Sequence, residues 1–249
     1  VKARNGRNFI MGIFAGVGCG AAVMPMSHQL KAAEIDDILA EAQLHVIIDD
    51  MSGVCPVKST HPLIEMNAES FSFIFTGKGQ SLPYAQHVHF PAFIRFTSGT
   101  TGKSKGVIVS HQSVIERIEG ANKALNLGAE DTVVWVLPMA YHFIVSVVLY
   151  VRFGTAIAVA KDFLARSIIE ITNRHEGTLL YASPVQIRLL SNDTGADKMP
   201  SLKKVISTSA SISPDVCLAF KNRFGIHVSQ AYGIIEIGLP MINFIKSAE

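Results

Sequence analysis

The chain has 249 residues, of which 49% are hydrophobic and 17% are charged, and this composition excludes intrinsic disorder. It predicts a globular protein with a large buried core. The net charge is only +2 with histidine neutral, and the basic residues are scattered, so nothing indicates a nucleic-acid partner.

The first predicted element is an uncharged run from Phe9 to Met26 that follows three basic residues. Such a run resembles a signal peptide or a membrane span. It contains four glycines and Pro25, a pattern that favours a buried helix followed by a strand over 21–26. We therefore expect no membrane span.

Helical and strand patterns alternate along most of the remaining chain. The expected helices cover 33–44, 112–125, 142–151 and 164–175, and two more begin after the cap pairs Ser183-Pro184 and Ser213-Pro214. The expected strands cover 46–48, 71–75, 91–96, 106–109, 132–137, 155–160, 178–181, 203–207 and 226–229. Residues 49–90 are expected to be connecting structure with one strand. The alternation predicts an α/β fold of mostly parallel sheets flanked by helices.

The most informative stretch runs from Phe96 to His111, between two apolar strand-like runs. It contains the hydroxyl side chains of Thr97, Ser98, Thr100 and Thr101, together with three glycines and two lysines. Glycines let backbone N–H groups converge on oxygen atoms, and lysine supplies positive charge, so the stretch predicts a phosphate-binding loop. A polar surface turn needs no such combination. The P-loop pattern does not fit, because its first glycine would stand at Thr97.

Residues 97–107 resemble the signature loop of the adenylate-forming enzymes, which include acyl-CoA synthetases, luciferase-like enzymes and peptide-synthetase adenylation domains. The family pattern is Thr-Ser-Gly-[Ser/Thr]-Thr-Gly-x-Pro-Lys-Gly, and here only Ser104 departs from it, in place of proline. The resemblance implies that the loop holds the β- and γ-phosphates of ATP and that Lys105 is a catalytic charge, while Lys103 is expected to face solvent. The ATP-binding residues implied are Thr97, Ser98, Gly99, Thr100, Thr101, Gly102 and Lys105.

A second stretch, Tyr232-Gly233-Ile234-Ile235-Glu236, resembles the family's Tyr-Gly-x-Thr-Glu. The resemblance implies that Tyr232 and Gly233 bind the nucleotide and that Glu236 holds magnesium in catalysis. Ile235 replaces the threonine, and a lost hydrogen bond to a charged group costs about 1 to 3 kcal/mol. We expect this turn and the phosphate loop to lie beyond the carboxyl ends of parallel strands.

Two further segments match the family. The stretch 137–143 is similar to a Pro-x-x-x-His segment that walls the acid pocket, which implies a catalytic-site role for His142. The run Ser207–Ser211 stands where relatives have Gly-Gly-Ala, so Ser209 and Ala210 are expected beside the nucleotide. Bulkier Thr208 and Ser209 disfavour long-chain acids, and the absence of an aspartate near His142 disfavours amino acids.

The resemblance implies an acid–thiol ligase that makes an acyl-adenylate and passes the acyl group to coenzyme A or to the phosphopantetheine of a carrier protein. The implied cofactors are ATP, Mg²⁺ and coenzyme A. Residues 1–249 would be part of the N-terminal adenylation domain, without the ribose-binding aspartate or the small C-terminal lobe and its catalytic lysine. The alternative is a nucleotide-binding but catalytically silent fragment or relative. A phosphotransferase would need an Asp-rich magnesium site, which the sequence lacks.

The cysteines bear on the compartment. Cys19, Cys55 and Cys217 are far apart, odd in number and outside any C-x-x-C spacing. This argues against a disulfide framework or a zinc site and predicts a cytoplasmic location.

Overall fold

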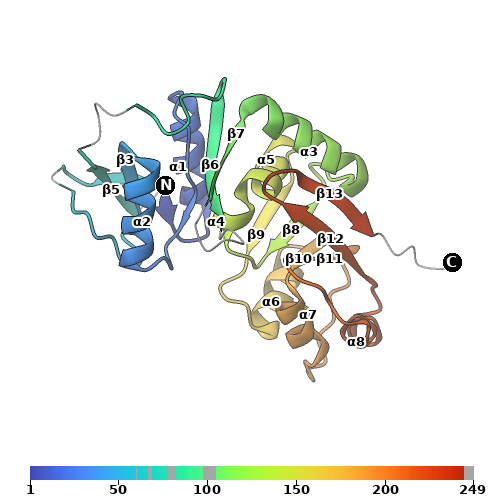
Figure 1. The fold of residues 1–249 in the computed structure, drawn as a ribbon. Helices are drawn as coiled ribbons and strands as arrows, with labels where there is room; N and C mark the ends of the chain where they lie inside the picture. The colour runs from blue at the N-terminus through green and yellow to red at the C-terminus, as the bar shows by residue number, and fades with distance from the viewer. Residues whose placement is uncertain (60, 67–68, 78–81, 98–104, 244–249) are drawn as a thin grey trace. The chain divides into compact units, whose positions relative to one another are not determined.

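The computed structural model describes residues 1–59, 61–66, 69–77, 82–97 and 105–243. Its contacts divide the chain into two compact units. The first unit comprises Val1–Glu116 and Pro138–Ile144, and the second comprises Arg117–Leu137 and Val145–Glu249 (Figure 1).

The first unit contains a mixed five-stranded sheet in the order β2-β1-β3-β5-β4, with a separate β6-β7 pair. Its elements are β1 (Lys2–Ala3), α1 (Arg7–Gly18), β2 (Met26–Ser27), α2 (Ala32–Ala42), β3 (Val46–Asp49), β4 (Ile64–Met66), β5 (Glu69–Phe75), β6 (Pro91–Thr97), β7 (Lys105–Ser110), the start of α3 (His111–Leu125), and α4 (Met139–His142). Strands β1, β2 and β3 are parallel, whereas β5 is antiparallel to both β3 and β4. Strand β4 was not predicted, because three residues are too few to show the alternating pattern of a strand.

The core of the first unit forms where the apolar side of α2 meets residues of other elements. The cluster consists of Met24, Met26, Ile35, Ala42, Ala85 and Ile94. A buried ion pair lies elsewhere in this unit, with Lys2 Nζ 2.9 Å from Asp49 Oδ1 and 3.0 Å from the carbonyl oxygen of Ser52. The charged partner Asp49 and the carbonyl oxygen of Ser52 together offset the cost of taking this ammonium group out of water.

The uncharged run near the N-terminus is a helix followed by an extended segment, as predicted. Helix α1 has 12 residues, and Val23 then forms a parallel bridge with Phe93. Within the described ranges, no helix has the length and apolar character that crossing a bilayer requires.

The second unit is built on a six-stranded sheet in the order β13-β12-β11-β10-β8-β9. Its elements are β8 (Thr132–Trp135), the π-helix η1 (Phe143–Val147, which starts in the first unit), α5 (Val148–Arg152), β9 (Ala156–Val159), α6 (Ala165–Arg174), β10 (Leu179–Ala182), α7 (Pro184–Ser191), β11 (Lys204–Ser207), α8 (Pro214–Phe224), β12 (Val228–Ile234) and β13 (Gly238–Asn243). Strands β8 to β12 pair in parallel, as the alternation of helices and strands predicted. Strand β13 is antiparallel to β12 and was not predicted.

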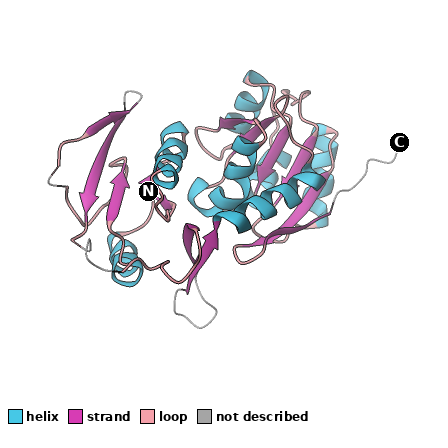
Figure 2. Ribbon diagram, turned by 90° about the horizontal axis from the view of Figure 1, so that it is seen from above, coloured by secondary structure: helices cyan, strands magenta, loops and turns pink. Residues whose placement is uncertain are grey.

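Helices α6, α7 and α8 share one core with this sheet, and Figure 2 shows helices on both of its faces. The core includes Ile168, Leu180, Ile187, Leu190, Val205 and Phe220, all at most 1% exposed. The predicted caps start two of the helices. The backbone N–H of Ser183 donates to Gln186 at 2.8 Å, and the Ser213 hydroxyl accepts from the N–H of Val216 at 3.4 Å.

Candidate functional site

The predicted phosphate loop lies between β6 and β7, which pair antiparallel as far as Thr97 and Lys105. Residues Ser98, Gly99, Thr100, Thr101, Gly102, Lys103 and Ser104 lie outside the described residues, so their predicted role stays a prediction. For Thr97 and Lys105 only the backbone is described. A Cβ on Gly106 would lie 2.3 Å from the hydroxyl oxygen of Tyr84, so a larger residue at this position would require the Tyr84 side chain to move.

The position of this loop in the sheet differs from the prediction. We expected it at the carboxyl edge of a parallel sheet, but β6 and β7 form a two-stranded antiparallel sheet. The physical reason is length, because the segment from 98 to 104 is shorter than the dozen or so residues that a parallel crossover needs.

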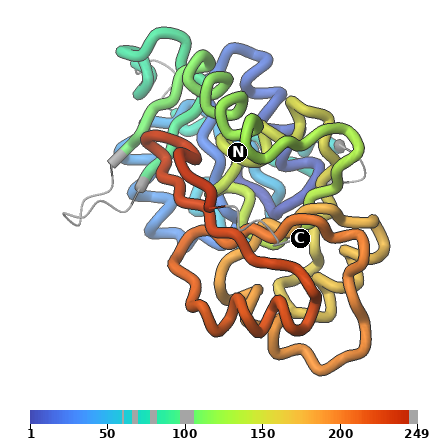
Figure 3. Tube along the Cα trace, turned by 90° about the vertical axis from the view of Figure 1, so that its right-hand side faces the viewer, coloured from blue at the N-terminus to red at the C-terminus, as the bar shows by residue number. Residues whose placement is uncertain are grey.

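The turn that carries Glu236 joins β12 to β13 as a hairpin, drawn as the red end of the described trace in Figure 3. Tyr232 is exposed on β12, and Gly233 lies so near β13 that a Cβ there would be 2.8 Å from the carbonyl oxygen of Gly238. Gly238 itself has φ +95°, a conformation that favours glycine. The hairpin therefore depends on glycine at both positions.

Arg117 on α3 holds this turn in place. Its two terminal nitrogens donate to the carbonyl oxygens of Ile235 at 2.8 Å and Glu236 at 2.7 Å. The stem of Arg117 also packs beside Gly238. Burial lowers the pKa of Arg117, and the charge of Glu236 opposes that effect. Arg117 thus restrains the backbone of the residue that the sequence assigns to magnesium.

Glu236 is the residue that the sequence predicts to hold magnesium, which stays a prediction. Its side chain is exposed, and within the described part of the chain its carboxylate forms neither a hydrogen bond nor an ion pair. Among the same residues there is no group of three or more His, Cys, Asp or Glu that could hold a metal. Magnesium prefers oxygen ligands and commonly shares them with phosphates. Glu236 fits this role only if nucleotide and water supply the remaining ligands.

His142 lies at the end of α4 in the first unit, and the π-helix η1 follows it directly. The start of α4 is fixed by Asn5, whose side-chain oxygen accepts from the N–H of Met139 at 2.8 Å. Burial, together with the positive charge of Arg95, lowers the pKa of His142 to about 4. The imidazole is therefore neutral near pH 7, and its predicted place in the wall of the acid pocket stays a prediction.

Arg95 joins strand β6 to the same segment. Its Nη1 donates to the carbonyl oxygen of Ala140 at 2.7 Å, and its guanidinium carbon lies 4.3 Å from the centre of the Tyr141 ring. Phe93, two positions earlier on the strand, also contacts this segment through Phe143, with ring centres 6.1 Å apart. One face of β6 therefore packs against the residues around His142.

The segment at the end of β11 is partly committed to the core of the second unit. Thr208 is buried and accepts a hydrogen bond from the Tyr181 hydroxyl at 3.3 Å. Ser209 and Ala210 are exposed, and Ser209 has φ +74°. The predicted contact of Ser209 and Ala210 with nucleotide stays a prediction, as does the narrowing of the acid pocket.

The predicted site residues fall into both units. Thr97, Lys105 and His142 belong to the first, whereas Ser209, Ala210, Tyr232, Gly233 and Glu236 belong to the second. Sequence reasoning missed Arg95 and Arg117. Arg95 could have been noticed as a cation within the apolar strand 91–96, but nothing local to Arg117 indicates a partner more than a hundred positions away.

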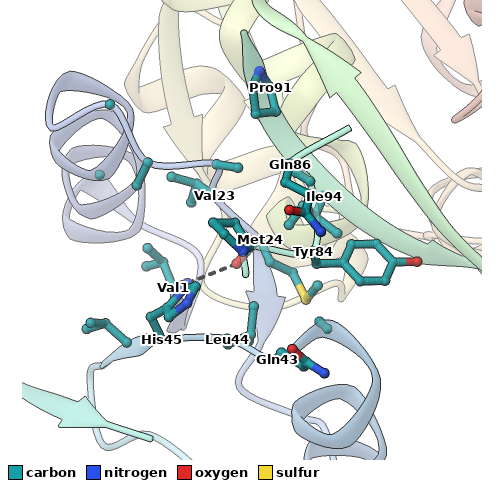
Figure 4. A pocket seen from close by; sticks show the side chains of 18 of the residues that line it. Val1, Val23, Met24, Gln43, Leu44, His45, Tyr84, Gln86, Pro91 and Ile94 are labelled. Atoms are coloured by element: carbon teal, nitrogen blue, oxygen red, sulfur yellow. Dashed lines mark hydrogen bonds between the residues drawn. The ribbon is translucent and has the colours of Figure 1, made fainter. Parts of the chain in front are cut away.

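A separate pocket of about 420 Å³ in the first unit contains none of the predicted site residues. Figure 4 shows its mostly apolar lining, which includes Val23, Met24, Leu44, Tyr84 and Ile94. Its lining also includes the polar side chains of Gln43, His45 and Gln86.

Comparison with known proteins agrees with the motifs. A model of the family described as AMP-binding enzyme matches residues 1–248. The chain is 25% identical to sulfoacetate–CoA ligase of Cupriavidus necator, over 96% of this chain and 49% of that protein. It is 26% identical to 4-coumarate–CoA ligase 1 of Oryza sativa subsp. japonica, over 96% of this chain and 47% of that protein. The chain thus spans about half the length of these curated relatives.

Solved structures share the fold. Apo MatB from Rhodopseudomonas palustris has a TM-score of 0.78 at 17% identity, covering 100% of this chain and 52% of that one. A long-chain-fatty-acid-CoA ligase from Archaeoglobus fulgidus has a TM-score of 0.73 at 19% identity, covering 96% of this chain and 53% of that one. The predicted fold class is confirmed.

Proposed function

Because the chain belongs to the AMP-binding enzyme family, we propose that its protein uses ATP to activate a carboxylic acid and then transfers the acyl group to a thiol. In the first step a carboxylate oxygen bonds to the α-phosphorus and pyrophosphate leaves. In the second step the thiol sulfur bonds to the acyl carbon, the thiol proton is released and AMP leaves. The observation that carries this proposal is the near-complete match of residues 97–106 to the family's loop, within a family match that covers almost the whole chain.

The residues take the roles that the motifs suggest. The 97–106 loop and Lys105 would hold and neutralise the triphosphate, and Tyr232, Gly233, Ser209 and Ala210 would surround the nucleoside. Glu236 would be one oxygen ligand of Mg²⁺, which supplies charge neutralisation when bound. Neutral His142 would wall the acid.

Coenzyme A is the favoured acceptor over a carrier protein, because the relatives compared above are named CoA ligases. The same names disfavour the catalytically silent alternative. The acid itself is left open, since sulfoacetate and 4-coumarate differ in size and charge. The cysteines described are all free thiols, which suits the proposed cytoplasmic location.

Two measurements test the proposal. Nucleotide binding by this chain is measured by calorimetry with ATP and Mg²⁺, and Lys105→Met should weaken it at least tenfold. Acyl-adenylate formation by the complete gene product is measured by trapping as hydroxamate with a panel of carboxylic acids. Nucleotide binding without hydroxamate from any acid would support the silent alternative, and failure of both would refute the proposal.

A further inference from the structure

Among the described residues, no carboxylate pairs with the positive charge of Arg95. None of the ion pairs within the described residues includes Arg95, and its hydrogen bond goes to a neutral carbonyl. The adjoining segment from 98 to 104 contains no acidic residue in its sequence. The part of the chain that the structure describes therefore offers this guanidinium no negative counter-charge.

Burial makes this lack of a partner costly. The Arg95 side chain is partly buried, and burial lowers its pKa, yet a guanidinium keeps its proton near pH 7. A charge removed from water and left without a counter-charge is unfavourable, so such groups commonly face an anionic ligand. The Tyr141 ring stacks on one face of the guanidinium, which leaves its planar edge as the donor surface.

The surroundings of Arg95 also select for negative charge. His142 stays neutral beside Arg95, so the positive charge at this place comes from Arg95 and not from His142. Asn5 and Ala140 contribute only neutral polar atoms to α4. The guanidinium of Arg95 is therefore the positive charge that lies against the segment Pro138–Ile144.

We propose that Arg95 is a specificity residue that binds a second anionic group of the acid substrate, a carboxylate or a sulfonate other than the carboxylate that is activated. This inference rests on the proposed function. The reacting carboxylate loses its negative charge as its oxygen bonds to phosphorus, so an arginine pairing with it would stabilise the ground state more than the transition state. A non-reacting anionic group keeps its charge throughout, and its pairing with Arg95 costs nothing in the chemical step.

Binding to this chain is tested first, because it does not depend on turnover. Thermal shift and calorimetry are run at fixed ionic strength with malonate and sulfoacetate as dianions, and with propionate and butyrate as monoanions. The dianions should bind at least tenfold more tightly. Arg95→Met should abolish this difference, and Arg95→Lys should keep part of it because the point charge remains without the planar fork.

The control variant is Arg152→Met, which removes one arginine from the surface, where it pairs with Glu119 at 3.6 Å. It should leave the preference for dianions unchanged. Equal binding of monoanions and dianions by the unmodified chain would overturn the proposal. So would a loss of preference in both variants, since that would reflect net charge alone.

Steady-state kinetics of the complete gene product separate the other roles of Arg95. The proposal predicts that Arg95→Met lowers kcat/KM for dianionic acids about 100-fold, while values for monoanionic acids and the KM for ATP change less than threefold. An equal loss for all acids would make Arg95 a structural tether of α4, and a raised KM for ATP would assign it to phosphate; either result refutes the proposal. If no acid is activated while dianions still bind through Arg95, the proposed function fails and the anion site stands.

Discussion

Replacing Arg117 by methionine should loosen the turn that carries Glu236 without removing the stem that packs beside Gly238. The change deletes two hydrogen bonds, of 2.8 and 2.7 Å, from a charged donor to the carbonyl oxygens of Ile235 and Glu236. Such bonds contribute about 1.5 to 3 kcal/mol each when buried. Arg117 is only partly buried, and water can replace it at the carbonyls, so we expect a total loss of about 1 to 2 kcal/mol.

The effect should appear in two measurements. Urea unfolding followed by circular dichroism should give a free energy of unfolding lower by that amount. Calorimetric titration with ATP should show that the variant needs about tenfold more Mg²⁺, because a loss of about 1.4 kcal/mol in holding the turn changes an equilibrium tenfold. Arg117→Lys should recover only part of both effects, since one ammonium group cannot reproduce the planar fork.

Arg152→Met is again the matched control, and its exposed ion pair should be worth less than about 1 kcal/mol. The reasoning about positioning is refuted if Arg117→Met lowers stability but leaves the Mg²⁺ requirement unchanged. It is also refuted if Arg117→Met and Arg152→Met have equal free energies of unfolding, because the two hydrogen bonds would then contribute nothing.

Three other changes have defined outcomes. Lys2→Met leaves Asp49 buried without its partner and should lower the free energy of unfolding by about 3 to 5 kcal/mol. Combining Lys2→Met with Asp49→Leu should restore most of this loss. If urea titrations show no recovery in the double variant, the prediction is contradicted. His142 has a folded pKa of about 4 and an unfolded pKa of about 6.5, so its protonation favours the unfolded state as the pH falls between these values. Between pH 7 and pH 5 the free energy of unfolding of the chain should fall by about 2 kcal/mol, a loss that His142→Gln should not show. Equal pH slopes for the chain and this variant would contradict that cause. Ser209→Gly should raise the melting temperature by relieving a positive φ worth about 1 kcal/mol, whereas Ser211→Gly, without that strain, should not.

Much of the fold follows from local sequence signals. Ser183 and Ser213 with the prolines after them predicted where α7 and α8 begin, because capping is decided within a few residues. Strands β8 to β12 were predicted to be parallel because helices alternate with them along the chain. A helical connection carries the chain back across the sheet, so that the next strand can run in the same direction.

The sequence by itself determined the family and the residues that bear the motifs. The loop at 97–106 is a contiguous run, so its residue types and their spacing can be compared directly with the family pattern. The tertiary structure decided that the strands flanking this loop form an antiparallel hairpin and that β13 pairs antiparallel with β12. It also decided which backbone carbonyls Arg95 and Arg117 bind. Arg95 donates a hydrogen bond to the carbonyl oxygen of Ala140, and Arg117 donates to two carbonyl oxygens of the 235–236 turn. Both arginines are far from these partners in the sequence. Their roles depend on which backbone carbonyls the folded chain brings within reach, and a backbone carbonyl is the same group in every residue, so no side-chain pattern encodes it.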